Sequence, residues 1–175
     1  AQKIAETCAS QISIGLENVN LFRKLKQTSF NDWLTKLPNR NEFINLISTM
    51  KINVDSKQNL ALVDLSHFSD VNDGLGQDIG DLLLKAISKR LRASFHESVK
   101  LARIGADVFG FIGPAKYLFP NQINEKFNAP FRAGQYALPV SVCMGLCKIE
   151  SEFDRGLNII KRCNIALNLA KKNPG

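Results

Sequence analysis

Two aspartates, Asp64 and Asp107, are the residues of this chain best placed for chemistry. Asp64 lies within the apolar run from Leu60 to Phe68, which predicts a strand. Asp107 lies at the tip of KLARIGADVFGFI, Lys100 to Ile112, where two apolar runs flank a Gly-Ala-Asp turn and predict a hairpin. If these strands are neighbours, both carboxylates meet at one end of a sheet and suit Mg²⁺ and the phosphates it serves. Acids are common at strand ends, so the spacing alone does not separate this site from ordinary turn residues.

The elements that must position these aspartates follow from periodicity. Residues 40–51 predict a helix that starts with a capping box, Asn39 and Glu42. Glycines punctuate a predicted loop after the first strand, and an amphipathic helix follows it, with Ile79, Leu83, Ile87, Leu91 and Phe95 on one face. Residues 116–128 predict a helix, 131–137 and 139–148 predict strands, and a last helix opens with a capping box of Ser151 and Asp154. The expected fold is an α/β (α+β) sandwich, in which helices flank a mostly antiparallel five-stranded sheet.

Residues 1–30 predict one further helix ahead of this domain, which spans 31–175. Its seam alternates spacings of four and three, as in a coiled coil: Ala1, Ala5, Cys8, Ile12, Gly15, Val19 and Phe22. Two interpretations remain open, a signalling linker that pairs with another helix, for example in a homodimer, and a helix docked on its own domain. We favour the linker.

Composition excludes several classes of function. The 175 residues carry a net charge of +7, which suits a phosphate-bearing partner. The basic residues Lys85, Lys89, Arg90 and Arg92 share a helix and are not interleaved with aromatics, so we expect a solvated surface and no nucleic-acid partner. No apolar run reaches the ~20 residues of a membrane span. Four cysteines without clustered histidines predict reduced thiols and a cytoplasmic domain, although a longer protein could be membrane-anchored.

Four motifs, in order, resemble those of one family. They are DWLTKLPNR (Asp32 to Arg40), ALVDLSHFSDVND (Ala61 to Asp73), GLGQDIGD (Gly74 to Asp81) and RIGADVF (Arg103 to Phe109), and the ending NIALNLAKKNPG is also similar. Together they resemble a GGDEF domain, the diguanylate cyclase fold of bacterial cyclic-di-GMP signalling. The resemblance implies a nucleotide-cyclase or palm-like sheet, and a reaction in which two facing domains join two GTP molecules.

The resemblance also implies roles for individual residues. Asp64, the carbonyl of Leu65 and Asp107 would bind Mg²⁺. Four residues would bind GTP: Phe68, Asn72, Asp81 and Lys171. Asn72 and Asp81 would read the guanine base, and Lys171 would meet the terminal phosphates. An alternative remains open, in which Asn72 and Asp73 form an Asx-turn and Asp81 caps a helix start.

Departures from the family pattern decide what we expect of the activity. Val108 stands where the family has Glu, so we expect no catalytic residue in this chain. Ala106 replaces the second glycine at a turn position that can require positive φ, where a Cβ costs about 1–2 kcal/mol. Uncharged residues replace three further family residues: Ser66, Ser69 and Gln77. His96 and Val99 occupy the slots of the family's inhibitory Arg and Asp, so product inhibition is not expected either.

The predicted function is therefore that of a degenerate GGDEF domain. It would be inactive, and would regulate a linked EAL phosphodiesterase domain, with GTP as a ligand. A helix like the exit helix of a GAF sensor precedes it, which predicts an upstream GAF-like domain. Two alternatives remain: a weakly active diguanylate cyclase that relies on Asp107, and a dimerisation or interaction module that binds no nucleotide.

Overall fold

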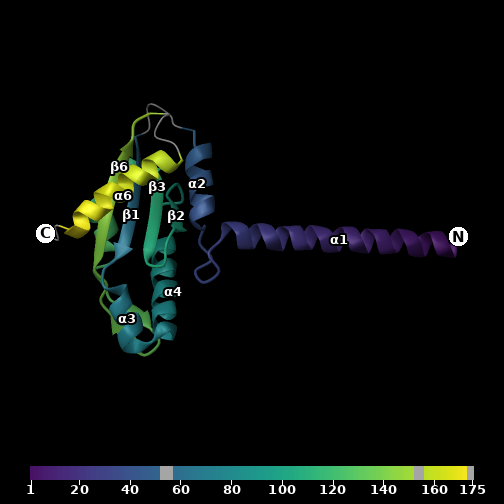
Figure 1. Cartoon of the computed structure of the whole chain (residues 1–175), viewed down its shortest axis with the longest axis horizontal. Helices are drawn as coiled ribbons and strands as arrows, with labels where there is room; N and C mark the ends of the chain where they lie inside the picture. Colours follow the sequence, from purple (N-terminus) through teal and green to yellow (C-terminus); the bar gives the residue numbers. More distant parts are fainter. Residues whose placement is uncertain (52–56, 152–155, 173–175) are drawn as a thin grey trace.

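A four-stranded antiparallel sheet carries both aspartates. The computed structural model describes residues 1–51, 57–151 and 156–172, and at residues 22–24 and 26–29 it describes the backbone alone. The strands are β1 (Gln58–Leu65), β2 (Lys100–Arg103), β3 (Val108–Pro114) and β6 (Val142–Ile149), in the order β2-β3-β1-β6 (Figure 1). Every pairing in this sheet is antiparallel, so the predicted fold class is confirmed.

Helices cover both faces of the sheet. They are α2 (Arg40–Thr49), α3 (Phe68–Leu75), α4 (Gln77–Ser94), α5 (Pro120–Glu125) and α6 (Leu157–Lys172), with a 3₁₀ turn at Ala115–Tyr117. Because side chains alternate along β1, Leu60 and Leu62 pack in one cluster with residues of α2 and α6. Ala61, Val63 and Leu65 pack in the other cluster, beneath α4. Asp64 has the parity of Leu60 and Leu62, so it faces α6.

The main sheet has four strands rather than the predicted five. The segment predicted as a strand at 131–137 forms instead a separate hairpin, β4 (Phe131–Ala133) and β5 (Tyr136–Leu138). Gly134 turns this hairpin at φ +61°, and Pro130 and Pro139 bracket it. Proline cannot donate a ladder hydrogen bond, which favours a short isolated ribbon over an extra strand of the sheet.

Two local predictions also change. The strand ends at Leu65 rather than Phe68, and the glycine-punctuated loop that was expected next contains helix α3. Gly76, at φ +91°, breaks the chain between α3 and α4, so one of the glycines does act as a breaker. Asp154 of the last predicted capping box lies outside the described residues.

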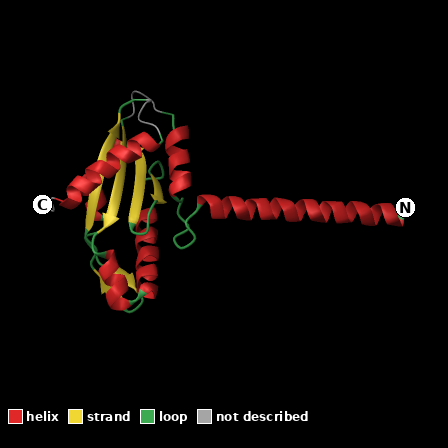
Figure 2. Cartoon of the chain, in the orientation of Figure 1, coloured by secondary structure: helices red, strands yellow, loops and turns green. Residues whose placement is uncertain are grey.

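Helix α1 (Gln2–Phe30) extends away from the rest of the chain (Figures 1 and 2). Seven large apolar side chains of this helix are exposed: Ile4, Ile12, Ile14, Leu16, Val19, Leu21 and Leu25. The helix is therefore present as predicted, and the side chains of its residues up to position 21 are exposed rather than docked on the domain. Among the described residues, no helix has both the length and the apolar character of a membrane crossing.

Candidate functional site

The sheet brings Asp64 and Asp107 to the same end. β1 and β3 are direct neighbours, and their register pairs Asp64 with Val108, the residue after Asp107. The backbone N–H of Leu65 donates to the carbonyl of Asp107 over 3.0 Å. Asp64 is 7% exposed and Asp107 is half-buried. The strand adjacency on which the predicted carboxylate pair depended is therefore present.

Lys171 reaches this pair from the last turn of α6. Its ammonium donates to Oδ2 of Asp64 over 2.5 Å, forming an ion pair. The Asp64 side chain is 10% exposed and that of Lys171 is 41% exposed, so the carboxylate is the more buried partner. Two of the predicted site residues, one for metal and one for phosphate, thus neutralise each other.

Val108 lies directly opposite Asp64 across the strand pair. Directly opposite residues share one face of a sheet, with Cβ atoms about 4.5–5.5 Å apart. A glutamate at this position would therefore place a second negative charge beside Asp64. On the other side Asp64 pairs with Cys143, so both cross-strand neighbours of the carboxylate are uncharged. The hydroxyl of Ser66, where the family has a further aspartate, lies 3.6 Å from the Cys143 sulfur.

The donor set of this corner fits a magnesium ion that is shared with phosphates. Mg²⁺ prefers oxygen ligands, and proteins usually supply one or two carboxylates while water and phosphate complete the coordination. Asp64 and Asp107 supply such carboxylates at one sheet end. The ammonium of Lys171 already balances the charge of Asp64, however, so the chain does not require a cation at this place.

The predicted guanine-reading residues gather around Gly80. Phe68 is buried at the start of α3, and Asn72 follows one turn later in the same helix. A Cβ at Gly80 would collide with the Asn72 amide oxygen and lie 3.3 Å from the Phe68 ring. The Asn72 amide oxygen is buried and has no hydrogen-bond partner among the described residues. Asn72 and Phe68 are therefore packed against α4 through a glycine.

Asp81 does not cap a helix. Helix α4 begins at Gln77 behind an N-cap glycine, Gly76, so Asp81 lies one turn inside it. Asn72 likewise lies within α3, and the structure shows no side-chain cap at the start of that helix. The alternative that gave these residues only capping roles is therefore wrong for Asn72 and Asp81.

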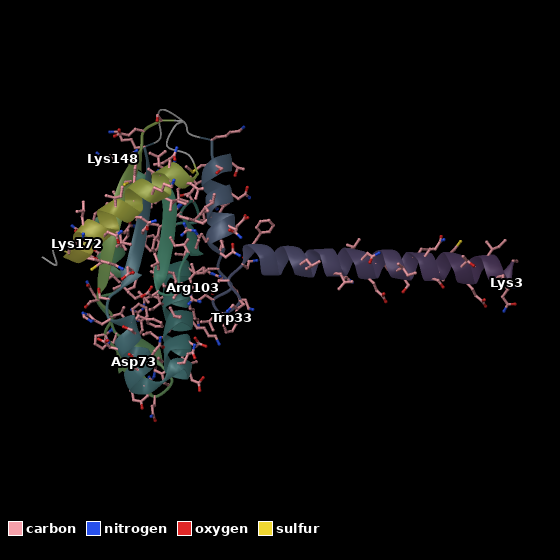
Figure 3. The ribbon with its side chains drawn as sticks, in the orientation of Figure 1. Lys3, Trp33, Asp73, Arg103, Lys148 and Lys172 are labelled. Carbon is pink, nitrogen blue, oxygen red and sulfur yellow. The ribbon has the colours of Figure 1, made fainter. Side chains whose placement is uncertain are left out.

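A network that sequence reasoning missed anchors the signature turn. Nη1 of Arg103 donates to both carboxylate oxygens of Asp32 over 3.1 Å, and its Nη2 donates to the carbonyl of Ala106 over 2.6 Å. Asp32 also accepts hydrogen bonds from the backbone and hydroxyl of Thr35. In Figure 3, Arg103, the last residue of β2, lies beside the loop that carries Trp33. Asp32 and Arg103 both lie in motifs that resemble those of the family, and this was the sequence signal that could have revealed the network.

The environment of Asp32 lowers its pKa below the ordinary value. Burial alone would raise this pKa, but the hydrogen bonds from Thr35 and Arg103 and the positive charge of Arg103 outweigh it. The Asp32 carboxylate is therefore a stable anchor for the turn at neutral pH.

The predicted backbone strain at Ala106 is absent. Among the described residues other than glycine, only Lys36 and His67 have positive φ. Two hydrogen bonds to the carbonyl of Val108, from the N–H groups of Ile104 and Gly105, close the turn without a left-handed residue at 106. The prediction of strain was wrong, because this turn does not need the freedom of a second glycine.

The structure also places the other residues that depart from the family pattern. His96 stacks on Tyr117, with 4.2 Å between ring centres, and hydrogen-bonds to Ser98. Val99 is buried and lies against Gly113. Ser69 is exposed in the first turn of α3, and Gln77 is exposed at the start of α4.

Comparison with known proteins places these features in one family. Residues 29–175 match the family described as "Diguanylate cyclase, GGDEF domain". Signaling protein YkoW of Bacillus subtilis is 30% identical over 161 residues, covering 86% of this chain and 20% of its own length. The bifunctional diguanylate cyclase/cyclic di-GMP phosphodiesterase MucR of Pseudomonas aeruginosa is 28% identical over 149 residues, covering 81% of this chain and 22% of its own length. The chain thus spans about a fifth of the length of these relatives.

Solved structures agree in fold. A diguanylate cyclase/phosphodiesterase from Caldicellulosiruptor saccharolyticus superposes with a TM-score of 0.73 at 27% identity, covering 85% of this chain and 90% of its own. The coiled coil and GGDEF domain of DgcB from Caulobacter crescentus superposes with a TM-score of 0.75 at 18% identity, covering 95% and 94%, which shows the fold alone. The motifs, the sheet and the match over residues 29–175 together show that the chain belongs to the GGDEF domain family.

Proposed function

We propose that this chain is a degenerate GGDEF domain that no longer makes cyclic-di-GMP, and that it regulates a linked EAL phosphodiesterase domain while still binding GTP. The observation that carries the proposal is the corner at Asp64. The carboxylate of Asp64 faces Val108 across the strands and pairs with Lys171.

The chemistry of the family explains why this corner matters. In the reaction that the resemblance implies, the 3′-hydroxyl of one GTP attacks the α-phosphate of another, and negative charge builds up on the phosphate. Loss of one group that stabilises such charge typically costs a factor of about 10²–10³ in rate. Val108 supplies no carboxylate for metal binding or proton removal, and Ser69 carries no positive charge toward the phosphates. Two such losses leave almost no cyclase activity.

Retained GTP binding rests on the residues around Gly80. Asn72 and Asp81 keep the amide and the carboxylate that can read guanine, and neither acts as a helix cap. Phe68 lies one turn before Asn72 in α3 and close to the same glycine, and Lys171 would meet the phosphates. When Mg²⁺ accompanies the nucleotide, Asp64, Asp107 and the carbonyl of Leu65 would hold it, and the ion would balance phosphate charge.

Calorimetric titration with GTP and Mg²⁺ tests the binding branch. We expect heat of binding for the natural chain and its loss in Asn72→Ala, because the amide that would read guanine is removed. Asp73→Ala is the matched control, since Asp73 is the exposed neighbour in the same helix, and it should bind as the natural chain does (Figure 3). Absence of binding at millimolar GTP would leave only a scaffold role.

Chromatography of a long GTP incubation tests the inactive branch. We expect no cyclic-di-GMP from the natural chain. Val108→Glu restores a carboxylate opposite Asp64 and should raise product above this background, whereas Val108→Gln, of similar size but uncharged, should not. Product from the natural chain that vanishes in Asp107→Ala would instead support a weakly active diguanylate cyclase.

The proposed partner domains rest on the relatives. MucR is described as bifunctional and NbdA of Pseudomonas aeruginosa as a cyclic di-GMP phosphodiesterase, and this chain covers about a fifth of each. We therefore propose a C-terminal EAL domain and an upstream GAF-like sensor in a longer protein. The sequence of the full-length gene product on either side of this chain tests both.

A second candidate function, dimerisation without nucleotide, is favoured by α1. This helix leaves the body with exposed apolar side chains, and the DgcB structure of similar fold includes a coiled coil. On this alternative the chain would pair with a second copy through α1. The mass of the natural chain in solution tests this alternative.

A further inference from the structure

A cavity of about 360 Å³ that is open to solvent lies between α4 and the loop at Thr35. Its lining residues are Thr35, Lys85, Ser88, Lys89, Arg92 and Ala93. None of them belongs to the candidate nucleotide site. In Figure 1 the loop before α2 runs beside α4, so two segments far apart in sequence form the two walls.

Three cationic side chains of α4 converge on this cavity. Lys85, Lys89 and Arg92 follow a spacing of four and three, which places them on one side of the helix. Like charges at this spacing repel each other and destabilise a helix, and an anion bound between them would reduce that repulsion. Within the described residues none of the three forms an ion pair, and Asp81, one turn before Lys85, does not pair with it either.

The fourth cation of this helix, Arg90, has a different role. Its guanidinium donates to the carbonyls of Ala129 and Pro130 and lies 3.5 Å from the centre of the Phe131 ring. It therefore fastens the β4–β5 hairpin to α4. The basic cluster that the sequence shows as one group thus divides into a structural arginine and three cations that line the cavity.

The hydrogen bonds that the lining side chains already make indicate which chemical class of ligand the cavity can bind. The hydroxyls of Ser88 and Thr35 already donate to the Leu84 carbonyl and to Asp32, so they have no proton to offer a ligand. Arg92 uses one of its five N–H groups to bond the Lys36 carbonyl over 2.8 Å, which fixes the guanidinium beside the loop. Recognition must therefore come from ammonium and guanidinium groups acting on acceptor oxygens.

We propose that this cavity binds a small anion with more than one phosphate group, such as pyrophosphate, tripolyphosphate or the phosphate tail of a nucleotide. Its volume lies in the range of about 300–1,000 Å³ that is common for small-molecule sites and exceeds the need of a single phosphate. Lysine and arginine are the usual phosphate ligands, and three of them match the charge of a di- or triphosphate. The inference is independent of GTP binding at Asn72 and Asp81, because no lining residue is shared.

Calorimetric titration of the chain with tripolyphosphate, without Mg²⁺, tests the proposal. We expect binding that weakens with added salt and falls about tenfold or more in Lys85→Ala/Lys89→Ala. Lys148→Ala/Lys161→Ala removes two exposed lysines elsewhere and should leave the affinity unchanged; Figure 3 shows Lys148 far from Trp33. A loss of the same size in Lys171→Ala would place the binding at the candidate nucleotide site and overturn the proposal.

Further titrations of Asn72→Ala identify the source of the phosphates. Equal binding of GTP and tripolyphosphate would assign recognition to the phosphate tail, and tighter binding of the nucleotide would add a contribution from its base. No binding of any of these anions, or equal losses in the Lys85/Lys89 and Lys148/Lys161 variants, would overturn the proposal. Binding of a glutamate-rich peptide in place of tripolyphosphate would also overturn it, since the surface would then be a protein-docking site.

Discussion

Lys171 and Asp64 form an ion pair although they lie 107 residues apart in the sequence. A surface ion pair contributes about 0–1 kcal/mol, but a carboxylate left alone in a buried place costs more. Here the Lys171 side chain is 41% exposed and the Asp64 side chain 10% exposed. We therefore expect the ion pair to contribute more to stability than a surface pair and less than a fully buried one. The pair therefore has a structural role in addition to any role toward phosphates.

We expect Lys171→Met to lower the free energy of unfolding by about 1–2 kcal/mol, because it keeps the aliphatic stem and leaves Asp64 without its counter-charge. Urea denaturation measures this change. In Asp64→Asn/Lys171→Met the loss should be smaller than the sum of the two single losses, since no charge remains to be compensated. Additive losses would show that the two side chains do not interact in solution.

The lowered pKa of Asp32 predicts a contribution to the free energy of unfolding that depends on pH in the acid range. Its pKa in the folded chain lies below the ordinary value of 3.8, so the folded state binds its proton less readily than the unfolded state. This stabilisation is present above pH 3.8 and is lost as the pH falls through the lower pKa of the folded chain. In Asp32→Asn the free energy of unfolding should fall at neutral pH and should depend less on pH in the acid range. Denaturation curves from neutral pH down to acid measure both effects, and parallel pH profiles would contradict the role assigned to Arg103 and Thr35.

The residues of the site were predictable to the extent that they depend on local pattern. The convergence of Asp64 and Asp107 followed from two strands and one turn. The ion pair of Lys171 with Asp64 joins residues that are 107 positions apart in the sequence, and the bridge of Arg103 to Asp32 joins residues that are 71 positions apart. Periodicity in the sequence does not predict contacts over such separations. The prediction of strain at Ala106 was wrong for a different reason. It was inferred from the family's glycine motif, and the turn of this chain does not adopt a positive φ at that residue.

At the scale of elements, the close contact of α6 with β6 depends on one glycine. A Cβ at Gly145 would collide with the backbone at Cys163 and lie 3.0 Å from the Leu167 Cα. The Cys163 thiol donates to the Gly145 carbonyl over 3.0 Å, and burial raises the pKa of this thiol, so it stays protonated and can donate. Lys171 lies two turns beyond Cys163 on the same helix, so this contact also places the ammonium at Asp64.

Gly145→Ala should therefore lower the free energy of unfolding by about 1–3 kcal/mol, since backbone atoms cannot move aside as a flexible side chain can. Thermal and urea denaturation measure the loss. Gly74→Ala is the matched control, because a Cβ there meets no atom within 4 Å and the residue lies in α3. Equal stability of the two variants would contradict the close packing of α6 on Gly145.

The elements themselves were predicted where amphipathic periodicity was strong. The hairpin, the helix from Gln77 to Ser94 and the last helix were present as expected, with boundaries shifted by a few residues. Helix α3 was missed because its glycines suggested a loop, whereas tertiary contact of Asn72 with Gly80 favours the helix there. The β4–β5 hairpin was assigned to the main sheet because strand pattern alone does not say which partner a strand chooses.

At the scale of the whole molecule, α1 exposes apolar side chains far from the core. Ile12 and Val19 lie on the predicted seam, seven residues apart, and Ile14, Leu21 and Leu25 form a second stripe with spacings of seven and four. An isolated helix in water is stabilised mainly when its apolar face is covered. In the part of the chain that the structure describes, α1 approaches the body near α2, and the side chains of residues 1–21 are all exposed.

We therefore expect Ile12→Glu/Val19→Glu to turn a dimer of this chain into a monomer, because two like charges would face each other across the seam in each copy. Light scattering measures the mass, and helical circular dichroism should fall with it as α1 loses its partner. Ser13→Glu/Asn20→Glu moves the same charges by one residue, onto the polar face, and should leave the dimer intact. The unfolding midpoint of the body should remain unchanged in both variants, because the substituted residues do not contact it. A natural chain that is monomeric at high concentration would remove dimerisation through α1 as a function, and the corner at Asp64 would then be the main remaining basis for a regulatory role.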